Sequence, residues 1–271
     1  MILEAASASH PGRVRPTNED ALASAIPEAA DLLDSKGALF GVADGVGGRA
    51  AGEVASREAM AALLAEYYSP RAPHQVELAL RQAVQAANVR VFRLSHGTDE
   101  AVHGMQTTLT AVVLAGGQAY VAHAGDCRAY LLRDGQLTQL TDDHSEAAEL
   151  LRLRLITPEQ ARRHPRRGVL TRTLGRQPAI RPDFSRQPLR AGDRFLLCSD
   201  GLWDTVERAA IERLLQRPAQ EACQALLNLA SQQGGGDNIS LHVVHVLDPG
   251  RRPATTAPAR LARLLAGLRG G

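Results

Sequence analysis

The chain has 271 residues, of which 44% are hydrophobic and 22% charged, a composition typical of a globular protein rather than a disordered or membrane-spanning one. A net charge of +2 and an aromatic content of 3% provide neither the basic excess nor the stacking platforms of nucleic-acid-binding proteins, so we expect no nucleic-acid partner. Cys127, Cys198 and Cys223 are widely spaced without a CxxC pair, which argues against a disulfide framework or a zinc knuckle. Because no signal peptide or long apolar run occurs, we expect a cytoplasmic protein without a membrane span.

Apolar runs of strand length recur at residues 38–43, 109–115, 119–123, 129–133, 195–199 and 239–247. Turn signals such as Gly116-Gly117 and Asp134-Gly135 link several of them and predict antiparallel hairpins. Apolar residues at helical period predict helices over 52–68, 75–94, 206–215 and 219–231. Runs of strands bounded by pairs of helices favour an α+β fold over alternating βαβ units.

Two segments differ from the rest of the chain. Residues 145–168 are charged, rich in arginine and poor in β-formers, which predicts a helical excursion over the surface and a candidate lid. From Pro249 onward the chain is basic and rich in proline, which predicts a flexible tail over 249–271. We therefore expect one domain over residues 1–248.

Asp44, Asp200 and Asp237 stand at the ends of predicted strands. With Glu19, Asp20 and Asp126 they make six carboxylates that hairpin pairing could bring to one end of a sheet. Two bare carboxylates about 4 Å apart repel by about 1 kcal/mol in water and about 4 kcal/mol at an effective dielectric of 20, so such a cluster needs cations or protons. Ligation by oxygen alone favours Mg²⁺ or Mn²⁺ over zinc.

Simpler interpretations exist for each of these motifs. An Asp-Gly or Asp-Asn pair beside a strand is commonly a turn, and only its recurrence at several strand ends argues for a shared site. Gly45, Gly47 and Ala50 fit a dinucleotide-binding fingerprint, but Asp44 would lie where the pyrophosphate binds and no strand follows to supply the ribose-binding acid. The glycines more plausibly let backbone carbonyls approach a metal closely.

Arg15 precedes Glu19 in the sequence RPTNED. Most arginines of a globular protein are solvated surface residues. Beside an acidic metal site, however, a guanidinium can grip a phosphate through two hydrogen bonds. We therefore interpret Arg15 as a candidate phosphate ligand.

Short motifs run through the chain in the order Arg15-x-x-Asn18-Glu19-Asp20, Val42-Ala43-Asp44-Gly45-x-Gly47-Gly48, Gly52-Glu53, Thr107-Thr108, Ala124-Gly125-Asp126-x-Arg128, Asp142-Asp143-His144-Ser145, Leu170-Thr171-Arg172-x-Leu174-Gly175, Ser199-Asp200-Gly201-Leu202-Trp203-Asp204 and Asp237-Asn238. This series resembles the motifs of the bacterial PPM (PP2C-type) metal-dependent protein phosphatases and covers about residues 5–247. The resemblance implies a four-layer α-β-β-α sandwich, in which helices flank two antiparallel sheets, with a metal centre at one end. It also implies a protein serine/threonine phosphatase in which a water bridging two metals attacks phosphoserine or phosphothreonine directly.

The resemblance implies a metal ligand set. Asp44 would bridge two tightly bound Mn²⁺ or Mg²⁺ ions, and the backbone carbonyl of Gly45 would bind one of them. Asp200 and Asp237 would complete the other site. Asp126, together with Asp200, would hold a third and weaker ion.

Catalytic roles are implied in the same way for Arg15, which would bind the substrate phosphate, and for Glu19 and Asp20, which would hold metal-bound waters. The chain departs from the family where relatives place a histidine near the Asp-Gly pair, because Val46 and Arg49 stand at those positions. This leaves the acid that protonates the leaving group open. His144 and the other histidines lack ligand spacing, so we predict structural or exposed roles for them.

Phosphorylated substrate proteins of a cognate Ser/Thr kinase are the implied partners, and we expect a monomer. The alternative is a regulator on the same fold that binds metal or phosphopeptide without turnover. Such a protein would be expected to have lost core ligands, yet all of them are present.

Overall fold

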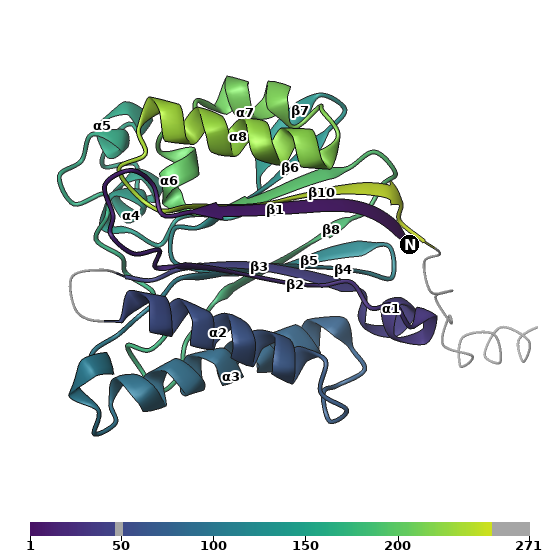
Figure 1. Cartoon of the computed structure of the whole chain (residues 1–271), viewed down its shortest axis with the longest axis horizontal. Helices are drawn as coiled ribbons and strands as arrows, with labels where there is room; N and C mark the ends of the chain where they lie inside the picture. The colour runs from purple at the N-terminus through teal and green to yellow at the C-terminus, as the bar shows by residue number, and fades with distance from the viewer. Residues whose placement is uncertain (47–50, 251–271) are drawn as a thin grey trace, which may run out of the picture.

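The computed structural model describes residues 1–46 and 51–250 and contains two antiparallel sheets packed face to face between layers of helices (Figure 1). In strand order, the first sheet consists of β1 Ile2–His10, β10 Ile239–Asp248, β9 Arg194–Cys198, β6 Arg128–Arg133 and β7 Gln136–Gln139. The second sheet consists of β2 Asp20–Ala25, β3 Ala38–Asp44, β4 Leu109–Ala115, β5 Gln118–Ala124 and β8 Asp183–Pro188. This arrangement confirms the predicted α+β sandwich.

Helices cover the outer face of each sheet (Figure 1). The second sheet is covered by α2 Gly52–Tyr67 and α3 Val76–Ser95, and the first by α6 Asp200–Trp203, α7 Arg208–Leu214 and α8 Ala219–Gln233. The remaining elements are α1 Ala30–Lys36, the 3-10 helix Glu100–Val102, α4 Glu146–Arg152 and α5 Pro158–Arg162. The last two lie in the predicted excursion at 145–168, so its helical character is confirmed.

Three apolar cores follow from this layering. One lies between the second sheet and α2 and α3, one between the first sheet and α6 to α8, and one between the two sheets. Successive residues of β4 alternate between cores, since Val113 packs toward α2 and α3 whereas Val112 and Leu114 pack between the sheets. Both faces of this strand are covered, which explains why the sequence there is a continuous apolar run.

The strands β1, β2, β7 and β8 were not predicted, so the expected order of strand, two helices, strands, two helices and strand was incomplete. All four strands occupy sheet edges, where one side of the backbone has no strand partner within the described residues and many side chains are exposed. Their sequences therefore contain small and polar residues in place of an apolar run.

Strand pairing brings the predicted acids to one end of the sandwich. Asp20 lies directly opposite Asp44 in the β2–β3 pair. Cys198, at the end of β9, pairs with both Arg128 and Leu241, so that the start of β6, the end of β9 and the start of β10 lie side by side. Asp126 and Asp237 lie in turns at this end, and Asp200 begins α6 directly after β9.

Some predictions fall on residues that the structure does not describe. Gly47, Arg49 and Ala50 of the glycine-rich stretch, and the predicted tail from residue 251 on, lie outside the described ranges. Within residues 1–46 and 51–250, no helix has the length and apolar character needed to cross a bilayer.

Candidate metal centre

Four carboxyl groups influence one another at this end of the sandwich, of which Asp126 is buried and Asp20, Asp44 and Asp200 are partly buried. Removal from solvent, together with the charges of neighbouring carboxylates, raises the pKa of Asp20 to about 7 and that of Asp200 to about 6. Burial, and then the charge of Asp200, likewise raise the pKa values of Asp44 and Asp126 well above their ordinary range. Without cations, the cluster must therefore hold protons near neutral pH.

Asp44 is fixed by the start of β4. Its backbone N–H donates to Thr108 Oγ1 at 2.8 Å, and its carbonyl accepts from Thr108 N at 2.9 Å and from Thr107 Oγ1 at 2.8 Å. Both threonines are fully buried. Hydrogen bonds on both sides of the backbone thus set the direction of the Asp44 side chain without using its carboxylate, which stays available to a ligand.

One of the two carboxylate oxygens of Asp20 is an unsatisfied hydrogen-bond acceptor within the described residues. Ser199 Oγ donates to Asp20 Oδ2 at 2.7 Å, whereas the buried Oδ1 atom has no hydrogen-bond partner among residues 1–46 and 51–250. An unpaired buried carboxylate oxygen is costly, and a metal-bound water or a cation would satisfy it. The donor set therefore fits a hard divalent cation.

Gly45 sits where its backbone approaches the start of α2. A Cβ atom on Gly45 would lie 2.3 Å from the Gly52 carbonyl oxygen, so only glycine fits here. A Cβ atom on Gly52 would in turn lie 2.9 Å from the Glu19 carboxyl carbon. This close packing places the predicted acid Glu19 beside the Gly45 backbone, and burial raises the pKa of Glu19.

Asp126 occupies the β5–β6 turn with 8% of its surface exposed. Its carbonyl accepts from Trp203 Nε1 at 2.9 Å, and the Trp203 ring is covered by the Arg128 guanidinium, 3.4 Å from the ring centroid. Arg128 is held by two hydrogen bonds to Asp143. The backbone of Asp126 is therefore anchored on the first sheet while its side chain faces the acidic cluster.

Arg15 and Asp237 form an ion pair at the open side of the cluster, with Nη2 and Oδ2 2.9 Å apart. Both side chains are about half exposed, so the guanidinium is accessible to a ligand from solution. The loop that carries Arg15 is tied to β10 by Asn238, whose Nδ2 atom donates to the carbonyls of Pro11 and Thr17. The structure thus brings Arg15, Glu19, Asp20, Asp44, Gly45, Asp126, Asp200 and Asp237 to one end of the molecule.

The cluster is loose as well as acidic. Among residues 1–46 and 51–250, no three His, Cys, Asp or Glu side chains converge tightly enough to enclose one ion by themselves. A cation here would take few protein oxygens and complete its shell with water, which is the usual behaviour of Mg²⁺. This fits the predicted ligand set, which includes a backbone carbonyl and carboxylates shared between ions.

Supporting residues that sequence reasoning did not assign are Thr107, Thr108, Ser199 and Asn238. All four stand in the series of motifs, which was the available signal. The hydrogen bonds themselves join segments far apart in sequence, such as Ser199 with Asp20.

We predict that Asp20→Asn stabilises the protein in chelator, increasingly so as pH rises. The pKa of Asp20 rises from its ordinary 3.8 to about 7 in the fold. A carboxyl with a raised pKa stabilises the fold fully below pH of about 4, and that stabilisation is lost as pH rises through about 7. Melting temperatures of the variant and the wild type at pH 5 and 7.5 should therefore diverge. Equal curves at both pH values would contradict the raised pKa.

Excess Mn²⁺ serves as the control for this prediction. Because a ligand that binds only the folded state stabilises it by mass action, Mn²⁺ should raise the melting temperature of the wild type. The rise should be smaller for Asp20→Asn, which lacks one carboxylate of the cluster.

Comparison with known proteins identifies the family of the chain. A family model described as protein phosphatase 2C matches residues 5–239. The serine/threonine protein phosphatase PstP of Mycobacterium tuberculosis H37Rv is 39% identical over 250 residues, which cover 92% of this chain and 46% of PstP. The serine/threonine phosphatase stp of Listeria innocua is 36% identical over 238 residues, covering 86% of this chain and 92% of the relative. The chain thus spans about half the length of the mycobacterial relative.

Solved structures agree with the sequence relatives. The crystal structure of M. tuberculosis PstP/Ppp superposes with a TM-score of 0.79 at 38% identity and covers 90% of this chain and 99% of the other. The catalytic domain of PstP in complex with two manganese ions gives a TM-score of 0.77 at 37% identity, covering 90% and 97%. With the fold, the order of the motifs and the family model in agreement, the chain belongs to the protein phosphatase 2C family.

Proposed function

We propose that this protein hydrolyses phosphoserine and phosphothreonine monoesters of other proteins with bound Mn²⁺ or Mg²⁺. The observation that carries the proposal is the buried acidic cluster, in which Asp20, Asp44 and Asp200 face one another with raised pKa values. Bacterial relatives named serine/threonine phosphatases, and a relative solved with two manganese ions, support it.

The ligand set proposed for two tightly bound ions consists of Asp44, Gly45 through its carbonyl, Asp200 and Asp237. Asp44 lies between the other acids, as its interactions with Asp20, Asp126, Asp200 and Asp237 indicate, so it is the natural bridge. Asp126 with Asp200 would hold a third and weaker ion. Asp126 interacts most strongly with Asp200 among its charged neighbours, which supports this pairing.

Paired divalent ions supply an activated water for in-line attack and neutralise charge on the phosphoryl oxygens. The protein supplies the positions of the reacting groups. Arg15, at the open side of the cluster, would orient the phosphate with two hydrogen bonds. Glu19 and Asp20 would accept hydrogen bonds from ordered waters, and the unpartnered Oδ1 atom of Asp20 is suited to this role. Direct attack by water requires no covalent phosphoenzyme.

The wider organisation is proposed on the same basis. Residues 1–248 would form the phosphatase domain, residues 145–168 a lid beside the site, and residues 249–271 a tail that catalysis does not require. A cytoplasmic monomer acting on substrates of a cognate Ser/Thr kinase fits the buried thiols of Cys127, Cys198 and Cys223 and the bacterial relatives.

Phosphate release from a phosphothreonine peptide tests the proposal directly. We expect turnover with Mn²⁺, none with chelator, and recovery when the metal is restored. A protein that binds the phosphopeptide with Mn²⁺ but releases no phosphate would instead be the non-catalytic regulator that the sequence left as the alternative.

Arg15→Ala is predicted to raise KM for the phosphopeptide by roughly 10- to 100-fold, because hydrogen bonds to a charged group contribute about 1.5–3 kcal/mol. The change in kcat should be smaller if the guanidinium binds phosphate equally in the ground and transition states. Steady-state kinetics at saturating Mn²⁺ measures both constants. Arg13→Ala, on the same exposed loop, is the matched control and should leave KM unchanged. An unchanged KM in Arg15→Ala would make Arg15 a solvated surface residue.

A further inference from the structure

The segment Asp142–Ser145 runs alongside the turn that carries Asp126 and holds it at several points. The carbonyl of Asp142 accepts from His123 Nε2 at 3.0 Å. Asp143 holds Arg128 through hydrogen bonds of 2.8 and 2.6 Å. His144 contacts Gly125, the residue before Asp126, through both its backbone and its ring. The residue that follows, Ser145, caps the start of α4.

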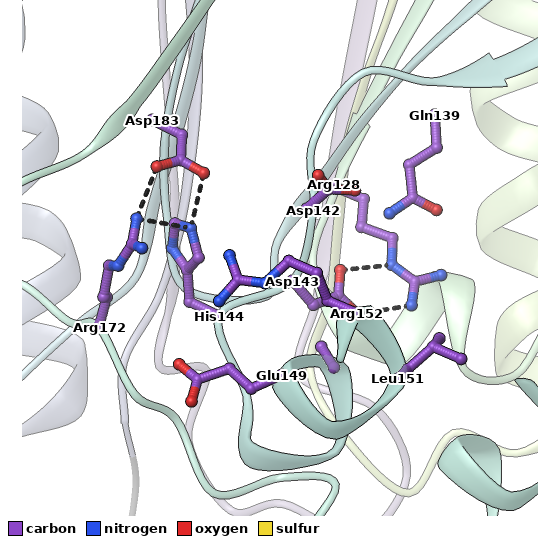
Figure 2. A pocket seen from close by; sticks show the side chains of 11 residues that line it. Arg128, Gln139, Asp142, Asp143, His144, Glu149, Leu151, Arg152, Arg172 and Asp183 are labelled. Carbon is purple, nitrogen blue, oxygen red and sulfur yellow. Dashed lines mark hydrogen bonds and ion pairs between the residues drawn. The ribbon is translucent and has the colours of Figure 1, made fainter. Parts of the chain in front are cut away.

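Figure 2 shows the ring of His144 beside Asp183 and Arg172, and its backbone and Nδ1 atom contact Gly125. Its backbone N–H donates to the Gly125 carbonyl at 2.7 Å, and Gly125 N–H donates to Nδ1 at 3.2 Å. Nε2 lies 3.1 Å from Asp183 Oδ2. A backbone N–H only donates and a carboxylate only accepts, so these partners assign a neutral ring with its hydrogen on Nε2. Burial lowers the pKa of His144, in agreement with a neutral ring.

Neighbouring groups hold the ring in this orientation. Arg172 Nη1 also lies 3.1 Å from Nε2, but both groups are donors, and Arg172 instead donates to Asp183 Oδ1 at 2.6 Å. The ring packs against His123 with centroids 4.7 Å apart and an angle of 32° between their planes. Burial lowers the pKa of His123 to about 3, so this neighbour is neutral too. The ring is therefore fixed at both nitrogens and on one face.

We propose that His144 is a positioning residue, which fixes the Gly125–Asp126 turn relative to the 145–168 segment through its hydrogen bonds to Gly125. The inference rests on the proposed function, in which Asp126 binds the weaker ion. Gly125 has φ of +115°, and a Cβ atom there would lie 2.5 Å from the Thr108 Cβ atom, so the turn has little room to move. Trp203 Nε1 donates to the Asp126 carbonyl, so Trp203 and His144 both hold the turn.

The same residue connects the turn to the 145–168 segment. Thr171 N–H donates to the His144 carbonyl at 2.8 Å, and Ser145 pairs with Leu170, so the two ends of the segment meet at His144. A cavity of about 430 Å³ opens beside it, lined by Glu149 and Arg152 of the segment and by Arg172 and Asp183 of the body. A shift of the segment would act on the turn through His144, next to the contacts of Asp142 with His123 and of Asp143 with Arg128.

Three variants separate the Gly125 contact from the Asp183 contact. His144→Ala removes both ring contacts and keeps the backbone hydrogen bond from His144 N–H to the Gly125 carbonyl. His144→Asn keeps an acceptor near the Nδ1 position and so preserves the bond from Gly125, whereas the longer His144→Gln places its amide nearer Nε2 and reaches only Asp183. Calorimetric titration with Mn²⁺ measures metal binding, and hydrogen exchange measures protection of the Gly125 and Asp126 amides.

We expect His144→Ala to weaken the lower-affinity Mn²⁺ site about tenfold, the effect of losing one buried hydrogen bond, and to leave the tighter sites unchanged. Exchange at Gly125 and Asp126 should accelerate by a similar factor. His144→Asn should restore both values to within about threefold, and His144→Gln should not. The matched control is His242→Ala, which also removes a buried imidazole. The His242 ring lies between the two sheets and donates a hydrogen bond to the Gly41 carbonyl. It should lower the melting temperature without changing either readout.

Unchanged exchange at the turn in His144→Ala, or equal rescue by the Gln and Asn variants, would overturn the inference. Failure of the proposed function would give different experimental results. Wild-type protein without Mn²⁺-dependent phosphate release, or an Asp126→Ala variant with unaltered Mn²⁺ binding, would refute the metal assignments. The exchange data of the three His144 variants would still decide whether the ring positions the turn.

Discussion

Asp44→Asn is expected to lower kcat/KM for a phosphothreonine peptide by about 10³-fold or more at saturating Mn²⁺. Metal ions contribute several kcal/mol to stabilising phosphoryl transition states, and each 1.4 kcal/mol is a factor of ten. Asp44 is the carboxyl group on which the other acids converge, so its neutral analogue should disturb both tightly bound ions. The fold should survive because Thr107 and Thr108 hold the Asp44 backbone rather than its side chain.

Stability measurements give this prediction a second, opposite readout. In chelator, Asp44→Asn should melt at a higher temperature than the wild type, because it removes one buried carboxyl from a group of mutually repelling ones. With Mn²⁺ the order should reverse. Asp31→Asn, in α1 at the far end of the molecule (Figure 1), is the control and should change neither activity nor metal-dependent melting. Full activity in Asp44→Asn would remove Asp44 from the metal centre.

The strands that could be predicted from the sequence are those buried on both faces, and the helices are those with one buried apolar stripe. β4 and β10 are almost entirely buried, and their apolar runs mark them within one residue of the observed bounds. β1 and β8 are different, because their side chains are largely exposed and their residues are small or polar. What makes β1 a strand is its pairing with β10 along its whole length, a contact with the far end of the chain. Local pattern does not contain that information.

Asp44, Asp126, Asp200 and Asp237 could be predicted because each stands beside a predicted strand, whereas Glu19 and Asp20 were assigned from the motif RPTNED. The hydrogen bonds that hold these acids in place could not be predicted. Asn238 reaches back to Pro11 and Thr17, and Ser199 reaches Asp20, so the hydrogen bonds that shape the site join β10 and β9 to the first two strands. His144 was expected to be structural because it lacks ligand spacing. Its partners Gly125 and Asp183 come together only through the packing of β5, β8 and the start of α4.

Asp126→Ala is the second large effect that we expect, and its size should depend on the leaving group. Val46 stands where the family resemblance implies a histidine in some members, so this position offers no proton donor. A cation held by Asp126 and Asp200 would supply an acidic water beside the leaving oxygen. Loss of Asp126 should then lower kcat on a phosphoserine peptide by about 10²-fold, the lower end of what a positioned proton donor contributes. The two tightly bound ions should remain.

The comparison substrate is p-nitrophenyl phosphate, whose leaving group needs little protonation. The loss of kcat in Asp126→Ala should be clearly smaller on this ester than on the phosphoserine peptide. Because the Asp126 carbonyl, and not its side chain, accepts from Trp203, the alanine variant keeps the anchor of the turn, and a global change in the fold is not expected. Equal losses on the two substrates would rule out a part for Asp126 in protonating the leaving group. Unchanged rates on both would reduce it to a turn residue before Cys127.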